Sequence, residues 1–597
     1  MKIKTSLTDF EVEGLENSSW EFHGNLIPVE ANVWQFDFSL VSGEAARYPK
    51  LTISWEFPLL DTVNCWSSQH SGSSDLPPDW GWKRSFSIAN HIPELVFHNR
   101  EGMCTASAAF SDALRTVEFS AGVHESTCAL RFTLALFRRE EAPGKEYAAS
   151  VRFNMNRIFY AEIVRKFTAW YETFPQYRPL PVPETAYDPL YSTWYCCHHD
   201  VHGDEIEREC HFAAACGMKT IIVDSGWEND DNSLGPGACG TWRPSVRRFP
   251  DFAAHVKRVQ ALGFRYLVWF AVPYIGKRSE NFKRFQGRYL RETFDAGILD
   301  PRFANVREFL ISACRALMSD YSLDGLKLDF IDLFTSGSDD PALSEGMGER
   351  DMISIPDAVD RLMTEICHAI RNVRPDALIE FRQPYSGPAI RKYGNMLRAT
   401  DCPADPGANR RNTIKLRLAS GKTAVHSDML EWRRDYDVIP AALQLLSVLF
   451  SVPQISVNFA ELPDDHRRML RFLLSFFIAH RDLLLKTDLN PRYPDYNYPV
   501  VYAVGKTERI AAVYCGGVCA EFGSEAYEGV TYLVNATARE GILLDFVRPK
   551  GGARAILRNC LGERIPVELP PDGLSRVPMP PASILEISPA ERPESRE

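Results

Sequence analysis

The alternation of apolar and polar positions divides the chain into three parts. From residue 1 to about 180, segments such as VWQFDFSLV and CALRFTLALF alternate apolar and polar residues and are separated by Gly, Ser, Asn or Asp turns. A period of two, with many Val, Phe and Thr residues, is typical of antiparallel sheet. The proline-rich stretch PQYRPLPVPETAYDP opposes regular structure and predicts a linker. We therefore expect an N-terminal β-domain over residues 1–180.

The segment 181–490 repeats an amphipathic helix followed by a short apolar strand. DEIERECHFAAACG places Ile206 and Cys210 on one helical face, ends at Gly217 and leads directly into MKTIIVD. Strands preceded by helices in this way are typical of parallel βα units. The strand candidates are YSTWY, TIIVD, RYLVWF, GLKLD, ALIEF, NMLRAT, TAVHS and QISVNF. Eight units predict a (β/α)8 TIM barrel, with a doubly wound sheet as the alternative, because a sequence does not show closure.

From residue 491 the alternation returns, in VVYAVG, RIAAVYC, TYLVNAT and ARAILRN. It predicts a smaller antiparallel β-domain over 491–597. The fold class is therefore multidomain, with a central (β/α)8 barrel between an N-terminal and a C-terminal β-domain.

Composition excludes several classes of protein. A hydrophobic content of 45% and a charged content of 24% exclude disordered, collagenous and coiled-coil chains. The net charge is −11 and no long Lys/Arg run occurs, so nucleic acid is not an expected partner. Neither a signal-peptide core nor an uncharged stretch of about 18 residues is present, which predicts a cytoplasmic protein without a membrane partner. The 14 scattered cysteines are expected to be reduced.

In a barrel, polar residues at the carboxyl ends of the strands face the active-site mouth. Those strand ends carry aromatic, acidic and cationic side chains: Trp194, Asp224, Trp269, Lys327, Asp329, Arg382, Asp401 and His426. The set is typical of a sugar site, where rings stack on aromatics and two carboxylates flank a glycosidic bond. Lys327 lies on the same strand face as Asp329, so its ammonium is expected to hold Asp329 ionised, as a nucleophile requires.

The segments VDSGWENDDNSLG, GTWRPSVRRFPDFAAHVKRVQALGFRYLVWF, DGLKLDFID and LRATD resemble glycoside hydrolase family 36, the α-galactosidase family of clan D. That family also has an N-terminal β-supersandwich, a central barrel and a C-terminal β-sandwich in this order, so the resemblance covers most of the chain. It implies a retaining exo-α-glycosidase that needs no metal and no cofactor. The implied substrate is a small oligosaccharide or glycoside, and a homo-oligomer is left open.

The resemblance also implies roles for individual residues. Asp329 would be the nucleophile and Asp401 the acid and base, with Asp405 as a rival in the same loop. Asp224 aligns with the first of two aspartates that bind O4 and O6 of galactose in the family, and Ser225 replaces the second. Each lost charge-assisted hydrogen bond would weaken transition-state binding by roughly 1.5–3 kcal/mol, enough to alter sugar specificity.

A second departure follows strand five, where EFRQPYSGPAIR replaces the family's Cys-Ser-Gly-Gly-Gly-Arg stretch. Arg382, Gln383 and Arg391 are expected there to face O2 of the sugar, and two arginines would suit an anionic or otherwise modified sugar. Trp227 and Arg398, within the resembling segments, complete the substrate-binding candidates.

Other interpretations stay open. A transglycosylase of the raffinose-synthase kind, an α-N-acetylgalactosaminidase-like specificity and a non-catalytic carbohydrate-binding protein on a degenerate barrel are the competing functions. Structural roles also compete: helix capping for Asp329, a turn for Asp401, core packing for Trp194 and Trp269, and a structural hydrogen bond for His426. The cluster HHDVH does not predict a metal site, because adjacent histidines on a strand point to opposite faces.

Overall fold

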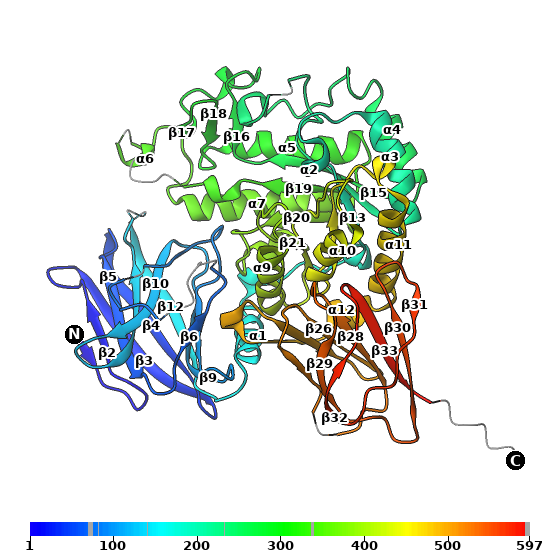
Figure 1. The fold of residues 1–597 in the computed structure, drawn as a ribbon. Helices are drawn as coiled ribbons and strands as arrows, with labels where there is room; N and C mark the ends of the chain where they lie inside the picture. Colours follow the sequence, from blue (N-terminus) through cyan, green and yellow to red (C-terminus); the bar gives the residue numbers. More distant parts are fainter. Residues whose placement is uncertain are drawn as a thin grey trace, which may run out of the picture.

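The computed structural model describes residues 1–69, 76–81, 83–139, 141, 143–231, 233–335, 340–344, 346–523 and 525–590. Three parts follow one another along the chain (Figure 1): paired sheets, a barrel surrounded by helices, and a second pair of sheets. The expected multidomain class, a (β/α)8 barrel between an N-terminal β-supersandwich and a C-terminal β-sandwich, is confirmed.

The N-terminal part consists of two six-stranded antiparallel sheets. The first sheet runs in the order β1 (Lys2–Ile3), β2 (Phe10–Glu13), β5 (Leu51–Pro58), β11 (Ala129–Leu136), β10 (Val117–His124) and β7 (Ser85–Phe86). The second runs in the order β3 (Trp20–Glu30), β4 (Val33–Ala46), β12 (Gly144–Asn154), β9 (Cys104–Phe110), β8 (Glu94–His98) and β6 (Asn64–Trp66). In β5, LTISWEFP buries every second residue. The period of two therefore separates an aromatic core from the outer faces.

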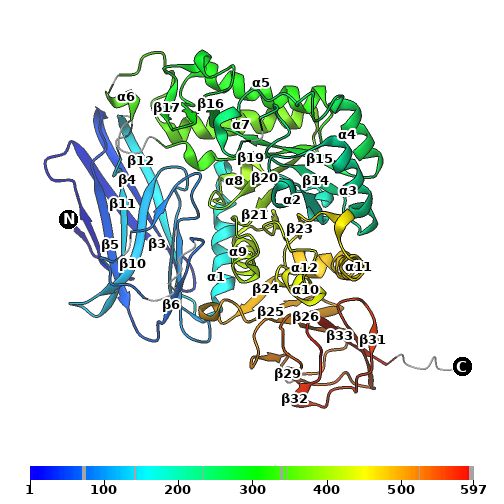
Figure 2. The ribbon, with the colours of Figure 1, turned by 45° about the horizontal axis from the view of Figure 1, so that its top comes forward.

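The segment after β12 joins the sheets to the barrel. Helix α1 (Tyr160–Tyr171) lies between the N-terminal sheets and the rest of the molecule in both ribbon views (Figures 1 and 2). The proline-rich stretch behind it forms only short turns of 3-10 helix at Pro175–Tyr177 and Glu184–Tyr187. Its prolines lack the amide donors that a longer helix or a sheet requires.

The eight predicted barrel strands are all present and parallel. In spatial order they are β22 (Ala424–His426), β21 (Met396–Arg398), β20 (Leu378–Arg382), β19 (Gly325–Asp329), β15 (Arg265–Ala271), β14 (Thr220–Val223), β13 (Leu190–Ser192) and β23 (Gln454–Ile455). Bridges between His426 and Val452 and between Leu430 and Ile455 join the outermost strands. These bridges favour a closed barrel over a doubly wound sheet, the alternative that the sequence left open.

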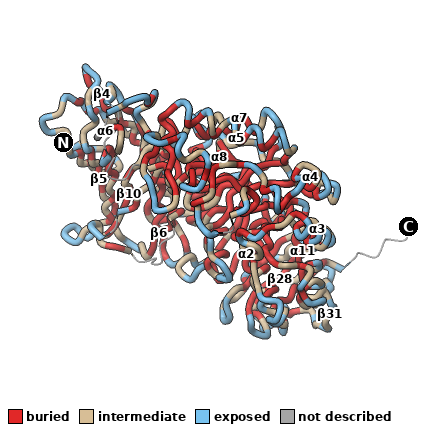
Figure 3. The backbone as a smooth tube through the Cα atoms, turned by 90° about the horizontal axis from the view of Figure 1, so that it is seen from above, coloured by how far each residue is buried: buried red, intermediate tan, exposed pale blue. Residues whose placement is uncertain are grey.

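Helices cover the outside of the barrel. They are α3 (Gly203–Ala215), α4 (Phe252–Ala261), α5 (Ala304–Asp320), α7 (Ile355–Val373), α8 (Ile390–Tyr393), α9 (Pro406–Ala419), α10 (Val438–Ser447), α11 (Asp464–Ala479) and α12 (Arg481–Lys486). The short helix α6 (Pro341–Ser344) lies apart from them, beside β17, in both ribbon views (Figures 1 and 2). Seen from above, buried segments run through the centre of the molecule and exposed segments form its outer loops (Figure 3). The apolar helix faces thus cover the strands on which the candidate residues lie.

Two features of the barrel differ from the prediction. The segment YSTWY is not one strand, because the first strand ends at Ser192 and Trp194 begins a four-residue helix, α2 (Trp194–Cys197). An antiparallel sheet of β16 (Tyr274–Gly276), β18 (Ala296–Leu299) and β17 (Tyr289–Glu292) follows β15. This insertion delays the helix that a βα unit places directly after its strand.

The C-terminal part is a β-sandwich with mixed strand directions. Its larger sheet has the order β24 (Leu489–Arg492), β25 (Val500–Val504), β26 (Glu508–Val513), β28 (Val530–Asn535), β33 (Ser583–Pro589), β30 (Ala553–Arg558) and β31 (Arg564–Ile565). The smaller sheet contains β27 (Cys519–Glu521), β29 (Ile542–Phe546) and β32 (Gly573–Val577). The pairs β26–β28 and β27–β29 are parallel, so the expectation of a purely antiparallel domain does not hold for them.

Two further predictions concern cysteines and membranes. All 14 cysteines lie among the described residues and each is a free thiol. Over the described ranges, no helix combines the length and the apolar character that crossing a bilayer requires.

Two positions in the barrel require glycine: a turn after α3 and a close approach of two strands. Gly217 adopts φ +86° directly after α3 and turns the chain toward β14, as the sequence predicted. Gly325 begins β19 where that strand pairs with β20, and a Cβ placed on it would lie 1.9 Å from the carbonyl oxygen of Leu378. The absent side chain therefore allows the strand that ends in Asp329 to reach its neighbour.

We expect Gly325→Ala to lower the free energy of unfolding by about 3 kcal/mol, because the new methyl group meets a backbone carbonyl that cannot rotate away. Thermal unfolding followed by circular dichroism measures the effect. Gly43→Ala is the control, because a Cβ there meets nothing within 4 Å. Equal unfolding temperatures for the two variants would contradict the close approach.

Candidate active site

The carboxyl ends of four barrel strands bring charged side chains together. Asp224 follows β14, Lys327 and Asp329 lie on β19, Arg382 ends β20 and Arg398 ends β21. Lys327 and Asp329 share a face because they are two residues apart on one strand. All of these strands are parallel, so their carboxyl ends meet at the same end of the barrel.

Asp329 is the most completely coordinated carboxylate of the site, and its residue is only 5% exposed. Its Oδ1 accepts hydrogen bonds from Arg382 Nε at 2.8 Å, from the hydroxyl of Tyr385 and from the amide of Phe330 at 2.8 Å. Its Oδ2 accepts one from Trp269 Nε1 at 3.0 Å. Donors from two strands and two loops therefore hold this carboxylate in one orientation.

Burial alone would raise the pKa of Asp329, but the positive charges of Arg382 and Lys327 outweigh it. The hydrogen bonds from Tyr385 and Trp269 lower the pKa further, to well below the usual value of an aspartate. Asp329 is therefore an ionised carboxylate inside a buried site. The expectation that Lys327 helps to keep it charged agrees with this arrangement.

Lys327 itself pairs with a different aspartate. Its ammonium donates to Oδ2 of Asp224 at 2.5 Å, and both side chains are almost fully buried. Oδ1 of Asp224 accepts the amide of Ser225 at 2.8 Å. The hydroxyl of Thr193 accepts the amide of Asp224 at 2.9 Å. Asp224 is thereby held between the ends of β13 and β19, and Ser225 is buried beside it.

Asp401 joins the same charged network through Arg398. Arg398 Nη2 donates to Oδ1 of Asp401 at 2.8 Å, and Nη1 of the same guanidinium pairs with the buried Asp428. The Arg398 side chain is 1% exposed, whereas that of Asp401 is 51% exposed. The buried Arg398 therefore fixes the position of the Asp401 carboxylate, which stays accessible from the mouth of the barrel.

Burial would raise the pKa of Asp401, but the charge of Arg398 and then those of Arg382 and Lys327 lower it below the usual aspartate value. For Asp428 the effect of burial outweighs the charge of Arg398, so the pKa of Asp428 is raised. The two partners of one arginine thus differ in their affinity for a proton.

Asp405, the alternative to Asp401 as acid and base, has a structural role instead. It precedes α9, and its Oδ1 accepts the amide of Ala408 at 2.9 Å. This is a helix N-cap, which occupies the carboxylate with the first turn of the helix. Trp194 begins α2, where its ring lies edge-on to His198 and within 5.7 Å of the ring of His199.

Two predicted substrate-binding residues, Trp227 and His426, are buried and bonded within the protein. Trp227 is fully buried, donates to the carbonyl of Trp269 at 2.9 Å and stacks on Phe252 of α4. His426 is fully buried inside the barrel with Nε2 at 2.8 Å from the carbonyl oxygen of Ala186. Burial lowers the pKa of His426 to about 3, so the ring is neutral at physiological pH.

The segment after strand five also corrects an expectation. Gln383 Oε1 accepts the amide of Thr400 at 3.0 Å, and Arg391 pairs with Glu172, the residue directly after α1. Arg382, the remaining candidate for reading O2, is bound to Asp329. The two arginines therefore do not form the pair that suggested an anionic sugar, because one holds a carboxylate of the site and the other holds α1.

Sequence reasoning missed Tyr385, Tyr195 and Asp428. Tyr385 lies in the stretch EFRQPYSGPAIR, which was considered only for its arginines, and its hydroxyl reaches Asp329. The hydroxyl of Tyr195 donates to Asp428 at 2.9 Å. A signal for Asp428 was present, because it follows the strand-end sequence AVHS directly. No comparable signal singled out either tyrosine.

The fold, a barrel with β-domains on both sides, is that of several solved α-galactosidases. The α-galactosidase from Lactobacillus brevis superposes with a TM-score of 0.64 at 12% identity, over 99% of this chain and 82% of that one. The GH36 α-galactosidase AgaA from Geobacillus stearothermophilus superposes with a TM-score of 0.65 at 13% identity, over 96% of this chain and 81% of that one. The resemblance to family 36 is thus confirmed in the fold.

Sequence comparison gives shorter matches. "Probable alpha-galactosidase G" of Emericella nidulans is 26% identical over 157 residues, which are 24% of this chain and 22% of that protein. An α-galactosidase of Escherichia coli is 26% identical over 118 residues, or 19% of this chain and 16% of the relative. The aligned segments thus span less than a quarter of these curated relatives. No protein-family model matches the chain.

We expect Arg382→Leu to lower the free energy of unfolding by about 3–5 kcal/mol, because it leaves the buried Asp329 carboxylate without its closest cation. Thermal unfolding at pH 7 measures the loss. Adding Asp329→Asn should recover part of it, since a neutral amide needs no counter-charge, and Arg382→Lys should lose less than Arg382→Leu. A double variant no more stable than Arg382→Leu would contradict the charge pairing.

Proposed function

We propose that the protein is a retaining exo-α-glycosidase of the α-galactosidase type, which hydrolyses a terminal α-linked galactose or a closely related sugar. The observation that carries this proposal is Asp329, an ionised and immobilised carboxylate at the end of β19. The fold of the GH36 α-galactosidases and the short sequence matches to two α-galactosidases support the same reaction class.

In the first step Asp329 attacks the anomeric carbon and forms a covalent glycosyl-enzyme. The donors Arg382, Tyr385 and Trp269 keep the attacking carboxylate in place, so that little reorganisation is needed as its charge moves to the substrate. Asp401 protonates the oxygen of the leaving group. In a retaining enzyme of this kind the two carboxyl groups act from about 5–5.5 Å apart.

In the second step Asp401, now ionised, takes a proton from water, and the hydroxide attacks the anomeric carbon. The C–O bond to Asp329 breaks, which restores its carboxylate and releases the sugar with its original anomeric configuration. Arg398 favours the ionised form of Asp401, as a general base requires.

Asp224 is the best candidate to bind the sugar hydroxyls. Its oxygens accept Lys327 and the amide of Ser225, and each oxygen keeps a further lone pair for a substrate hydroxyl. Ser225 offers only a hydroxyl where the family has a second carboxylate. Galactose therefore remains the first sugar to test and N-acetylgalactosamine the second. Related solved structures of the Geobacillus enzyme hold raffinose and stachyose.

Asp329→Asn is expected to reduce the hydrolysis of an aryl α-galactoside by about 10⁴-fold, because the variant lacks the nucleophile. Steady-state kinetics with 4-nitrophenyl α-galactoside measures the loss, and circular dichroism checks the fold. Asp405→Asn is the matched control from the same site, and it should keep its kcat, since Asp405 only caps α9. Sugar binding without turnover by the unmodified protein would instead identify a non-catalytic carbohydrate-binding protein.

The pH dependence of kcat/KM should differ between substrates whose leaving group needs a proton and substrates whose leaving group does not. The lowered pKa of Asp401 means that its protonated fraction falls as pH rises above that value, while Asp329, with its own depressed pKa, stays ionised. For raffinose, whose leaving group needs a proton, kcat/KM should fall as pH rises from 4 to 7. For 2,4-dinitrophenyl α-galactoside it should stay nearly constant. Parallel profiles for the two substrates would argue against Asp401 as the acid.

A further inference from the structure

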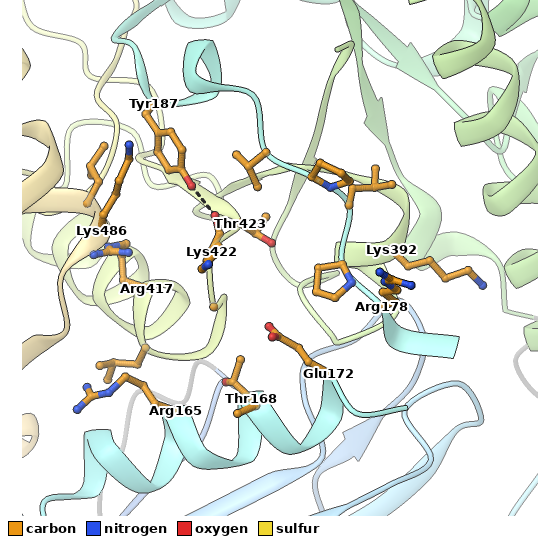
Figure 4. A pocket seen from close by; sticks show the side chains of 18 of the residues that line it. Arg165, Thr168, Glu172, Arg178, Tyr187, Lys392, Arg417, Lys422, Thr423 and Lys486 are labelled. Atoms are coloured by element: carbon orange, nitrogen blue, oxygen red, sulfur yellow. Dashed lines mark hydrogen bonds between the residues drawn. The ribbon is translucent and has the colours of Figure 1, made fainter. Parts of the chain in front are cut away.

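A large cavity lies at the opposite end of the barrel from the charged network. Its volume is about 1180 Å³, and its walls include α1, the proline-rich stretch and the ends of α7, α9 and α12 (Figure 4). Gly421, Lys422 and Thr423 line it immediately before β22 begins. The cavity therefore faces the amino ends of the strands, whereas Asp329 and Arg398 end their strands on the other side.

The lining of the cavity is positively charged, whereas the protein as a whole has a negative net charge. The chain as a whole carries −11, yet seven cationic side chains line this space against three carboxylates. The cations are Arg165, Arg178, Arg371, Lys392, Arg417, Lys422 and Lys486, and the carboxylates are Glu172, Glu184 and Asp488. A concave surface lined by one sign of charge raises the local concentration of ions of the opposite sign.

Each of the three carboxylates already has a cationic partner. Glu172 pairs with the buried Arg391, which lies behind the wall. Glu184 accepts Lys486 at 2.9 Å, and Asp488 lies 3.4 Å from Arg165. The acidic side chains of the wall are thus neutralised within the protein and do not balance the remaining cations.

Several cations of the cavity have no such partner. Over the described residues, no carboxylate pairs with Arg178, Arg371, Arg417 or Lys422. Arg417 donates only to backbone carbonyls, those of Phe450, Leu484 and Thr487. Burial lowers the pKa of Arg417 to about 10, so this guanidinium is still charged at neutral pH. A desolvated cation with neutral partners favours an anion from outside the chain.

The positions of the cations suit an anion that enters the cavity. Figure 4 shows Lys422 between Arg417 on one side and Arg178 on the other. The nearby Lys486 and Lys392 are already paired with Glu184 and Asp360. Leu180, Val182 and the ring of Tyr187 add apolar surface to the wall. Cationic groups thus alternate with surface that can contact the uncharged part of a small molecule.

We propose that this cavity is a second ligand site, which binds a small phosphorylated molecule. A phosphate group carries up to two charges and several acceptor oxygens, so it can engage lysine and arginine donors at the same time. The volume is far larger than a free phosphate needs and slightly exceeds the usual range of small-molecule pockets, about 300–1,000 Å³. The ligand class is therefore an organic phosphate, such as a sugar phosphate, held by Lys422 and Arg178.

Isothermal titration calorimetry at constant ionic strength tests the site, with glucose 6-phosphate, inorganic phosphate and pyrophosphate as probes. Glucose and potassium chloride are the controls for the sugar and for charge screening. The variants are Lys422→Glu and Arg178→Glu. Lys145→Glu is the matched control, because Lys145 is an exposed lysine of β12 in the N-terminal sheets.

We expect saturable binding of glucose 6-phosphate that is at least 10-fold weaker in Lys422→Glu and in Arg178→Glu, and unchanged in Lys145→Glu. Tighter binding of glucose 6-phosphate than of inorganic phosphate would assign the apolar wall to the sugar. Failure of all three phosphates to bind, equal heats from chloride, or undiminished binding in both cavity variants would overturn the proposal. Binding is measured directly, so these outcomes do not depend on the proposed hydrolysis.

Discussion

The charged carboxylate of Asp329 inside the barrel is the constraint on which the site depends. Removing a carboxylate from water is costly unless cations and hydrogen-bond donors replace the solvent. Here the replacement comes from Arg382 at the end of β20, from Tyr385 in the loop behind it and from Trp269 on β15. Because these donors come from two different strands and a loop, the carboxylate is stabilised only when the barrel is assembled.

The need of every buried charge for a partner also explains the other ion pairs at the mouth of the barrel. Lys327 cannot be buried without a partner, and Asp224 provides one from the neighbouring part of the barrel. Arg398 likewise lies between Asp401 and Asp428. The mouth is therefore a nearly balanced set of buried ions. The cavity at the other end is not balanced, since seven cations line it against three carboxylates, and this difference favours a ligand there that is itself an anion.

Local patterns predicted the fold well and the site in part. The barrel strands are short apolar runs, and several of them follow a helix and a turn glycine, so their positions follow from a few neighbouring residues. Asp329 and Lys327 were predicted for the same reason, as polar positions at a strand end. The tyrosines were not, because Tyr385 reaches Asp329 only through a loop whose path depends on the assembled barrel. Arg382 and Arg391 were treated alike, yet they bind carboxylates in different parts of the molecule.

The sequence alone determined the order of the three parts, the eight strands and the carboxylates at the strand ends, because periodicity and turn residues act over a few positions. Tertiary structure decided which of those side chains share one network, that Trp227 and His426 pack inside the protein, and that Arg391 is joined to α1. It also produced the basic cavity, whose walls come from segments more than 300 residues apart. Contacts of this kind depend on how helices and strands pack across the whole barrel, which no local pattern encodes.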